Sequence, residues 1–320
     1  MSKSILAFLS LSILVAISCC CGFLPTFWGK LETPSPTTTE VTSPPTPPTT
    51  TEATSPPEPI GAAVATSFQG FGIDYCGPEL AECAALGVTW SRYTGIRTLA
   101  DAQAALDLAQ SLNIKLLLRL PNRDWGWNGN QFDLTPLREF ETVFDHPALL
   151  GFYGLHEPWE RFDADQLRLF YQQFHQVVAG HNLLLWHDLG HIRSTFTDGI
   201  CDLCGVSAYP HVWGRDGEPV NDWERTTRKL DGALQYMAGT SATLCVGPQV
   251  FGREASKRRE RMPTPEEYIE NVRLIVETYG VRCITNYAWT HHSYDHVLGD
   301  ADQAPLREAV RQMSERYFGP

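Results

Sequence analysis

The stretch LLGFYGLHEPWERFDADQLRLFYQQFHQVVA at residues 149–179 contains a strand, a loop and a helix in that order. Residues 149–155 are apolar, aromatic or glycine, which is typical of a strand buried on both faces. Residues 164–179 repeat apolar side chains every three or four positions, which indicates an amphipathic helix packed on one side. The stretch is therefore one strand-loop-helix unit of the kind that builds parallel sheets.

The same unit recurs along residues 60–320. Further apolar runs, rich in β-branched or aromatic residues, predict strands at 68–74, 87–92, 114–120, 182–187, 203–209, 243–250 and 282–289. Amphipathic stretches predict helices at 98–112, 222–238, 265–279 and 304–317. Eight strands in 261 residues suit a (β/α)8 barrel, which typically has about 250 residues. A doubly wound open sheet is the alternative, but no glycine-rich dinucleotide fingerprint opens the first helix. We therefore predict an α/β fold, a closed (β/α)8 TIM barrel.

Two segments precede this domain and lack its pattern. Residues 1–30 contain Lys3 and an apolar run from Ile5 to Ile17, too short for a membrane span and typical of a signal peptide. The run is followed by Cys19, and Ala16-Ile-Ser-Cys19 resembles a lipoprotein signal whose cysteine is lipidated. Residues 31–59 form a linker, with ten Thr and nine Pro among residues 33–59. Such a segment cannot bury a core, so we expect it to be extended and disordered.

These two segments together predict export. We expect an extracellular protein at the cell surface, anchored to the membrane through a lipid on Cys19. An ordinary cleaved signal and a retained N-terminal anchor are the alternatives. The charge balance restricts the other partners: 25 Lys and Arg against 37 Asp and Glu give a net charge of −12, which argues against nucleic-acid binding.

In (β/α)8 barrels the chemistry occurs at the mouth formed by the C-terminal ends of the strands. Here the strand ends and the loops that follow them carry charged, amide and aromatic residues: Asp74, Arg92, Asn122, Trp125, His156, Glu157, Asp188, Tyr209, His211, Gln249 and Trp289. Aromatic rings stack on the C–H faces of sugars, while charged and amide groups bind sugar hydroxyls. Any one of these aromatic residues is more often part of a core. Their coincidence at strand ends predicts a site for an oligo- or polysaccharide, without a cofactor.

The segment Gly151-Phe-Tyr-Gly-Leu-His-Glu-Pro-Trp159 resembles the fourth strand of clan A glycoside hydrolases, where Asn-Glu-Pro carries the catalytic acid/base. The resemblance implies that Glu157 is the general acid/base and that His156 replaces the Asn that holds the sugar 2-hydroxyl. A general acid must keep its proton near neutral pH, so we expect Glu157 to be partly buried among aromatic side chains. Other landmarks follow in order, namely the strand-two arginine (Arg92), the strand-six tyrosine (Tyr209) and the strand-eight aromatic that floors the sugar subsite (Trp289).

The sequence departs from the clan at strand seven. Val246-Gly-Pro-Gln-Val-Phe-Gly252 resembles this strand, but Gln249 stands where the clan has its nucleophilic Glu, and an amide cannot form the usual glycosyl-enzyme ester. Both hydrolytic mechanisms normally need two carboxyl groups. Asp188, on the neighbouring strand, is the best candidate for the second, ahead of Asp74, Glu254 and Asp295. Two alternatives stay open, namely substrate-assisted catalysis with Gln249 as an orienting group, and a carbohydrate-binding pseudoenzyme that has lost the nucleophile.

Histidines at strand ends suggest a metal-dependent hydrolase as a third alternative, since His187 and His191 are four residues apart. Barrel metallohydrolases carry His-x-His at strand one, where this chain has Gly72-Ile-Asp74, so we predict no metal site.

The cysteines of residues 60–320 fall into three pairs. In an exported chain we expect disulfides for Cys76/Cys83, across one loop, and for Cys201/Cys204, in a CxxC before strand six. Cys245 and Cys283 lie on adjacent predicted strands and fit either a disulfide or two buried thiols.

Overall fold

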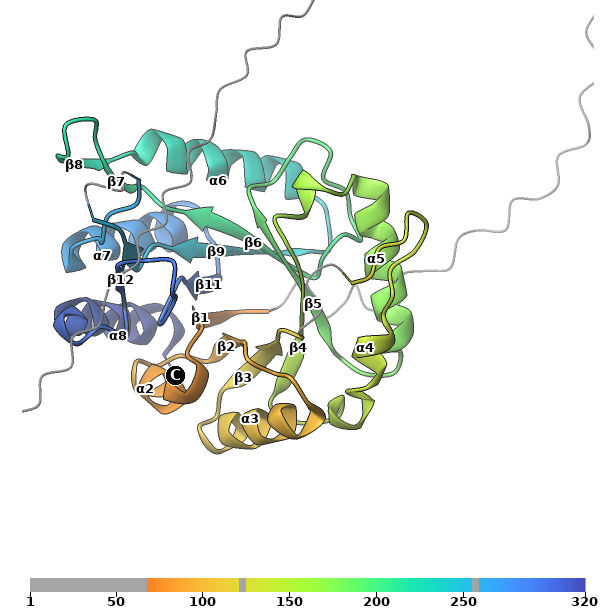
Figure 1. Cartoon of the computed structure of the whole chain (residues 1–320). Helices are drawn as coiled ribbons and strands as arrows, with labels where there is room; N and C mark the ends of the chain where they lie inside the picture. The colour runs from red at the N-terminus through yellow and green to blue at the C-terminus, as the bar shows by residue number, and fades with distance from the viewer. Residues whose placement is uncertain (1–67, 121–124, 255–258, 320) are drawn as a thin grey trace, which may run out of the picture. The chain divides into compact units, whose positions relative to one another are not determined.

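The computed structural model describes residues 68–120, 125–254 and 259–319. Eight parallel strands form a closed barrel, in the order β1-β11-β9-β6-β5-β4-β3-β2 (Figure 1). Their bounds are β1 Gly70–Asp74, β2 Trp90–Tyr93, β3 Lys115–Leu118, β4 Leu149–His156, β5 Leu184–Gly190, β6 Leu203–Ala208, β9 Thr243–Pro248 and β11 Cys283–Asn286. Each of these eight strands overlaps a strand predicted from the sequence. The predicted (β/α)8 barrel is confirmed.

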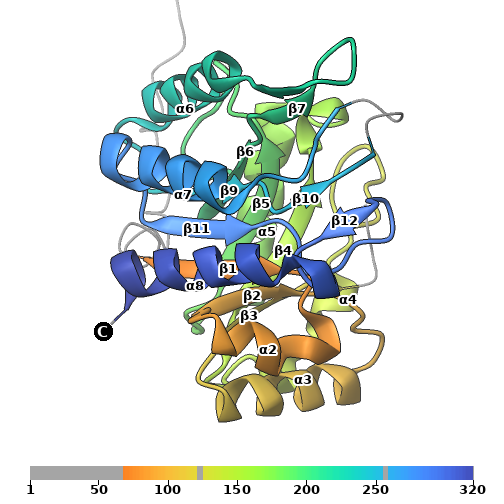
Figure 2. The same ribbon diagram turned by 90° about the vertical axis from the view of Figure 1, so that its left-hand side faces the viewer.

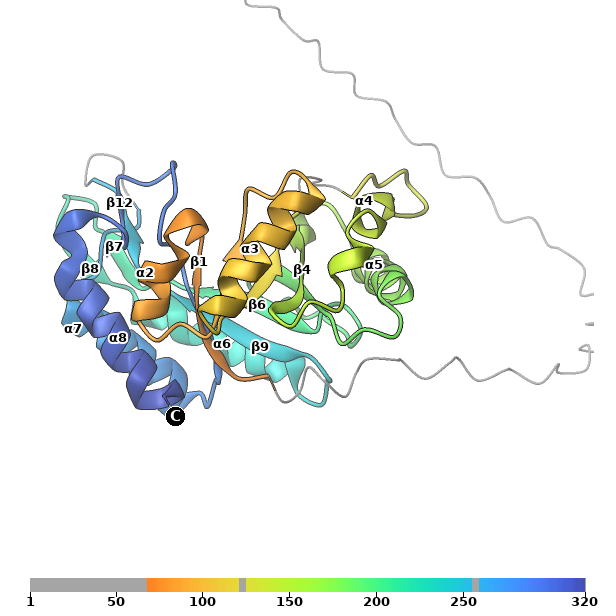
Figure 3. The same cartoon turned by 90° about the horizontal axis from the view of Figure 1, so that it is seen from below.

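Helices cover the outside of the barrel. They are α2 Leu80–Ala85, α3 Leu99–Ser111, α4 Thr135–Arg138, α5 Ala164–Val177, α6 Trp223–Met237, α7 Pro265–Arg273 and α8 Ala304–Phe318. Short 3-10 turns occupy Gly77–Glu79, Glu141–Val143, Pro158–Glu160 and Ala301–Gln303, and a π-helical turn continues α7 over Leu274–Thr278. Figure 3 shows α7 and α8 on one side of the barrel and α4 and α5 on the opposite side. The connection from β5 to β6, residues 191–202, contains no helix, which departs from the ideal alternation.

Several helices begin where the sequence supplies a cap. Thr98, Asp163 and Thr264 each accept a hydrogen bond from the backbone N–H three residues later, and the side chain at that position bonds back to the cap backbone. These capping boxes satisfy N–H groups that the first helical turn leaves unpaired. They fix the starts of α3, α5 and α7.

Two indoles fill the centre of the barrel. Trp90 and Trp186 are buried with ring centroids 5.4 Å apart, inside a cluster whose other buried members are Leu117, Tyr153, Leu184, Leu203, Cys245 and Cys283. Glycines on neighbouring strands make this possible. A Cβ atom at Gly72 would lie 2.4 Å from the Trp90 ring, and one at Gly205 would lie 2.5 Å from the Trp186 ring. The barrel is therefore packed solid below its mouth.

The three cysteine pairs form disulfides, Cys76–Cys83, Cys201–Cys204 and Cys245–Cys283. The last joins β9 to β11 inside the barrel, since the two residues are direct partners in the strand register. The alternative of two free thiols at these positions is therefore wrong.

Two small antiparallel sheets extend the rim of the mouth. One pairs β7 His211–Trp213 with β8 Pro219–Asn221, and the other pairs β10 Phe251–Gly252 with β12 His296–Val297. Figure 2 shows β7, β10 and β12 at the same end of the barrel, on the right of the view, toward which β11 points. This end carries the carboxyl ends of the barrel strands.

Some predictions fall on residues outside the described ranges. These are the signal segment 1–30 with Cys19, the linker 31–59 and the substrate-binding assignment of Asn122. Across residues 68–120, 125–254 and 259–319, no helix is both long and apolar enough to span a bilayer.

Candidate functional site

The floor of the mouth is an ion pair between the first two strands. Asp74 ends β1 and Arg92 lies beside it on β2, where the strand register places them as direct partners. An Arg92 amino group donates to Asp74 at 2.7 Å, and the two side chains are 1% and 3% exposed. Arg92 also lies over the rings of Tyr75 and Tyr153, with its guanidinium carbon 5.0 and 4.7 Å from their centroids. The cation is thus held by a carboxylate and by aromatic faces.

Asp188, near the carboxyl end of β5, lies on the other side of Arg92. Its carboxylate is 3.6 Å from an Arg92 amino group and 3.1 Å from Nδ1 of His156, which is its partner in the register of β4 and β5. The backbone N–H of Gly190 donates to its other oxygen at 3.3 Å. Asp188 is 17% exposed, so it lies at the boundary between the barrel interior and the solvent.

The pKa values of the two aspartates shift in opposite directions, because only Asp188 has a hydrogen bond from His156. Burial raises the pKa of Asp74 to about 6, although the charge of Arg92 opposes the shift. Burial also acts on Asp188, but there the hydrogen bond from His156 and the charge of Arg92 outweigh it, so the pKa of Asp188 is lowered. The mouth therefore contains one firmly ionised carboxylate, Asp188, and one that titrates in the weakly acidic range, Asp74.

Glu157 follows β4 on the rim. Its backbone is left-handed, with φ of 44°, and its N–H donates to the Asp188 carbonyl oxygen at 2.7 Å. Its side chain is exposed. The expected partial burial among aromatic side chains is therefore wrong, because the left-handed turn carries Glu157 outward as the strand ends. Position 190 is glycine, and a Cβ atom there would approach a Glu157 carboxyl oxygen to 3.1 Å.

Tyrosines line the remaining wall of the mouth. Tyr209 follows β6, as predicted, and its ring centroid lies 6.5 Å from that of Tyr287. Tyr287 follows β11 and also contacts Tyr75, with centroids 5.4 Å apart. A cavity of about 10 Å³, room for about one water molecule, lies among Asp74, Arg92, Asp188, Tyr209 and Tyr287.

Sequence reasoning missed Tyr287 and Lys229. Residues 283 and 285 of β11 face the barrel interior, so the two-residue alternation of a strand points to 287 as the next inward position. Lys229 lies on α6, where a strand-end rule gives no signal, and its ammonium group is 3.5 Å from the Ser207 carbonyl oxygen. Burial and the neighbouring Arg225 lower the pKa of Lys229, whereas the negative charges of Glu157 and Asp188 oppose this.

Two predicted sugar-binding tryptophans are buried instead. Trp125 is 1% exposed and its indole N–H donates to the Gly154 carbonyl oxygen, with its ring packed on Phe170. Trp289 is 2% exposed and donates to Glu79. The assignment of both as substrate-binding surfaces is wrong in this conformation. Each side chain turns into the layer between the barrel and its outer segments, where no sugar can stack on it.

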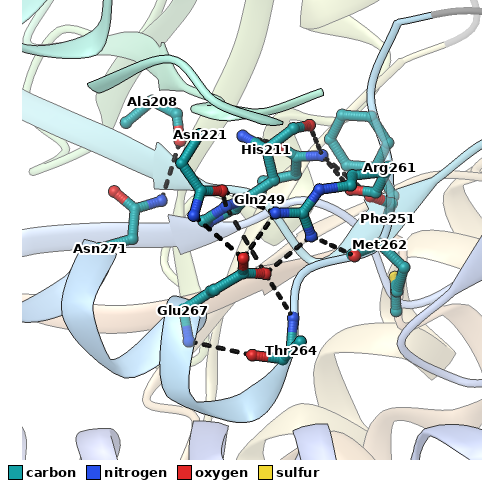
Figure 4. Close-up of polar contacts among 10 residues, drawn as sticks. All are labelled: Ala208, His211, Asn221, Gln249, Phe251, Arg261, Met262, Thr264, Glu267 and Asn271. Carbon is teal, nitrogen blue, oxygen red and sulfur yellow. Dashed lines mark hydrogen bonds and ion pairs between the residues drawn. The ribbon is translucent and has the colours of Figure 1, made fainter. Parts of the chain in front are cut away.

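Gln249 belongs to a structural network rather than to the open mouth (Figure 4). It is fully buried, and its amide N–H groups donate to the carbonyl oxygens of His211, Phe251 and Arg261 at 3.0, 3.2 and 2.6 Å. Its own carbonyl oxygen accepts from the His211 N–H at 3.2 Å. These bonds tie the segment after β9 to β7. Both the oxygen and the nitrogen of the amide are hydrogen-bonded to backbone groups, so the side chain cannot orient a substrate.

His211 lies in the same network and is also fully buried. Its Nδ1 donates to the Asn221 side-chain oxygen at 2.8 Å, and burial lowers its pKa. Arg261 binds both Asn221 and Glu267. Burial raises the pKa of Glu267, but the hydrogen bonds from Arg261 outweigh burial, and the pKa of Glu267 falls to about 2. The predicted substrate contact of His211 is wrong in this arrangement, since its ring has no exposed surface.

Among residues 68–120, 125–254 and 259–319, no three His, Cys, Asp or Glu side chains converge on a point that could hold a metal ion. His187, which the metal alternative invoked, lies on β5 with its ring packed on Phe170 of α5, and burial lowers its pKa to about 3.

The chain is similar to known proteins in its fold and not in its sequence. No protein-family model matches the chain, and no curated protein matches it in sequence. A hyperthermophilic endo-β-1,4-glucanase in complex with substrate matches with a TM-score of 0.54 and 12% identity, over 79% of this chain and 100% of that one. Gas2p of Saccharomyces cerevisiae, in complex with laminaritetraose and laminaripentaose, matches with a TM-score of 0.50 and 12% identity, over 79% of this chain and 64% of that one.

A glycoside hydrolase family 17 β-1,3-glucanosyltransferase from Rhizomucor miehei matches with a TM-score of 0.47 and 13% identity, over 68% of this chain and 86% of that one. At such identities, the likeness to the glucanase and to Gas2p establishes the fold class: the chain has the (β/α)8 barrel on which these carbohydrate-active proteins are also built.

Proposed function

We propose that the protein hydrolyses a glycosidic bond at the C-terminal mouth of its barrel. The observation that carries the proposal is the adjacency of Glu157, which follows β4, and Asp188, near the end of the neighbouring strand β5; a backbone hydrogen bond of 2.7 Å joins them. Glu157 exchanges a proton with the reacting groups, as the sequence predicts. Asp188 supplies a fixed negative charge beside it. Two carboxyl groups therefore lie at one mouth, a feature that this site shares with glycoside hydrolases in general.

The surroundings of the pair suit a sugar. Tyr75, Tyr209 and Tyr287 offer ring edges and faces, and the exposed His156 supplies a polar group. Arg92 is 1% exposed, so it acts through Asp188 rather than by the predicted contact with the sugar. β-Glucans are the first substrates to test, because the glucanase and Gas2p structures with the same fold hold such ligands. This choice rests on likeness of fold alone.

A panel of soluble polysaccharides and nitrophenyl glycosides tests the proposal. We expect the wild-type protein to release reducing sugar from at least one β-glucan. The double variant Glu157→Gln/Asp188→Asn keeps the shape of both side chains but removes both carboxyl groups, and it should release none while its thermal unfolding stays cooperative. Activity of the double variant equal to that of wild type would disprove the site.

A second candidate is carbohydrate binding without hydrolysis. The observation that favours it lies at the seventh barrel strand, β9, where Gly247 faces the small cavity and Gln249 is consumed in the network with His211 and Arg261. No carboxyl group from β9 Thr243–Pro248 reaches the mouth, because this strand contains none. Isothermal titration with the same glycan panel separates the two candidates, since a pseudoenzyme binds an oligosaccharide that it leaves intact.

We further propose that the protein is exported and held at the cell surface by a lipid on Cys19. Three disulfides support an oxidising compartment, because cytosolic proteins rarely keep such bonds. Cys19→Ala should move the protein from the detergent phase to the aqueous phase in a detergent partition, or block its maturation. Unchanged partitioning would rule out lipidation at this residue.

A further inference from the structure

His156 connects the buried charges of the barrel to the open mouth. Its Nδ1 atom lies 3.1 Å from the Asp188 carboxylate, and its side chain is 55% exposed. Within residues 68–120, 125–254 and 259–319, the hydrogen bond of the His156 ring is the one at Nδ1, and its Nε2 atom makes none. An ionised carboxylate accepts only, so Nδ1 carries a hydrogen and Nε2 is the nitrogen that faces incoming molecules.

The Asp188 carboxylate can orient this imidazole because two other groups fix the carboxylate in place. Arg92 lies 3.6 Å from the same carboxylate oxygen, and the Gly190 N–H bonds the other oxygen. Arg92 is fixed in turn by Asp74 at 2.7 Å. A chain of four polar side chains therefore runs from the closed interior to an exposed imidazole. This is the arrangement in which a carboxylate orients a histidine for proton transfer.

Three charged groups face His156, and together they favour its protonated form. The hydrogen bond with Asp188 on β5 raises the pKa of His156 most, burial opposes the rise, and the charge of Glu157 adds to it. Arg92 on β2 acts in the opposite direction and is the weakest of these influences. Glu157, by contrast, is exposed and lacks the burial that a carboxyl donor was expected to need.

We infer that His156, positioned by Asp188, donates the proton to the leaving sugar oxygen, and that Glu157 is the base that activates water. The inference rests on the proposed hydrolysis and assigns its proton transfers. A water O–H bond breaks and its proton passes to the Glu157 carboxylate, while the water oxygen bonds to the anomeric carbon. The glycosidic C–O bond breaks, and the leaving oxygen takes the proton from Nε2 of His156. Neutral His156 and protonated Glu157 return to their starting forms by exchange with solvent.

Leaving-group dependence tests which group donates the proton. A dinitrophenyl leaving group needs no proton, whereas a sugar hydroxyl does. His156→Gln should therefore lower kcat on an oligosaccharide by about 10²–10⁴-fold, the usual contribution of general acid catalysis, and lower it far less on the matching dinitrophenyl glycoside. Glu157→Gln should impair both substrates alike. His156→Ala, at a half-exposed position, should regain part of its activity when imidazole is added.

The pH profile tests the role of Asp188 as a positioning residue. Loss of its charge in Asp188→Asn weakens the protonated form of His156, so the alkaline limb of the kcat profile should move to lower pH. If Asp188 had only a structural role, Asp188→Asn would lower kcat and leave the alkaline limb of the pH profile at the same pH.

The outcomes separate this inference from the proposed function. Absence of hydrolysis by wild type on the whole panel overturns both. If wild type is active and His156→Gln keeps full activity on oligosaccharides, the inference fails alone. It also fails if Glu157→Gln, rather than the His156 variants, shows the leaving-group-dependent loss, because Glu157 is then the donor.

Discussion

The carboxylate of Asp74 lies 2.7 Å from the guanidinium of Arg92, and both side chains are closed off from solvent. The pair joins β1 to β2 at the level where the barrel opens. Arg92 is shared with Asp188, so the protonation of Asp74 bears on the charge balance of the whole mouth. The pair thus links the stability of the barrel to the chemistry proposed at its rim.

Asp74→Asn should change how stability depends on pH. The folded-state pKa of Asp74, about 6, lies above its unfolded value of 3.8, so the stability linked to its proton is complete below 3.8 and is lost as pH rises to 6. The variant cannot lose that proton. Its free energy of unfolding, relative to wild type, should rise by up to about 1.4 kcal/mol per pH unit in this window. Chemical denaturation at pH 4, 5, 6 and 7 measures it, with the exposed Asp216→Asn as control. A constant difference would refute it.

His187→Asn should show the opposite dependence. Burial lowers the folded-state pKa of His187 to about 3, below the unfolded value of 6.5. The stability linked to neutral His187 is therefore complete above pH 6.5 and is lost as pH falls toward 3. Asparagine can accept the hydrogen bond that Leu155 N–H gives to Nδ1, at 2.9 Å, and does not titrate. We expect a shallower acid decline for this variant than for wild type or the exposed control His292→Asn. Equal slopes in all three would contradict the assignment.

Gln249→Glu should damage the fold rather than create a nucleophile. The amide N–H groups of Gln249 donate to three backbone carbonyl oxygens, and a carboxylate would place unpaired negative charge against them. Such a buried, unpaired charge costs about 3–5 kcal/mol of stability. Gln173→Glu is the matched control, because the Gln173 oxygen accepts from the Phe132 N–H and a carboxylate can do the same. Gain of hydrolysis by Gln249→Glu with unchanged melting temperature would show that the side chain can reach the mouth.

The packing of the barrel interior predicts a cost at Gly72. Alanine there would set a methyl group 2.4 Å from the Trp90 ring, and overpacking of this kind costs about 1–3 kcal/mol. Gly232→Ala, within helix α6, meets only an ordinary contact of 3.7 Å and should be neutral or stabilising by up to about 1 kcal/mol. Thermal and urea unfolding compare the two variants. Similar stability of both would show that the indoles can move aside.

Much of the fold could be predicted from the sequence because its signal is local and repeated. Each barrel strand is a buried apolar run, and a run such as 149–155 is visible without knowledge of its neighbours. The same reasoning places Arg92, Glu157 and Asp188 at one mouth, since the carboxyl ends of parallel strands meet there. Those assignments follow from chain order alone.

The errors concern which way a side chain turns after its strand ends. Trp125 and Trp289 follow strands, but both rings lie in buried layers. Strand alternation points to Tyr287, which the family landmarks do not include. The family resemblance places Gln249 at the substrate, whereas its role depends on Arg261, twelve residues later, and on His211 of another strand. Contacts of this kind depend on register and loop path, which the local sequence does not encode.

The rate of hydrolysis by Glu157→Gln tests the central claim most directly. The matched control is Glu160→Gln, an exposed glutamate in the 3-10 turn that follows Glu157. On the glycan that wild type cleaves best, we predict that Glu157→Gln lowers kcat by about 10²–10⁴-fold, while Glu160→Gln keeps the wild-type rate and both variants unfold at the wild-type temperature. A Glu157→Gln variant as active as wild type would contradict the proposed site.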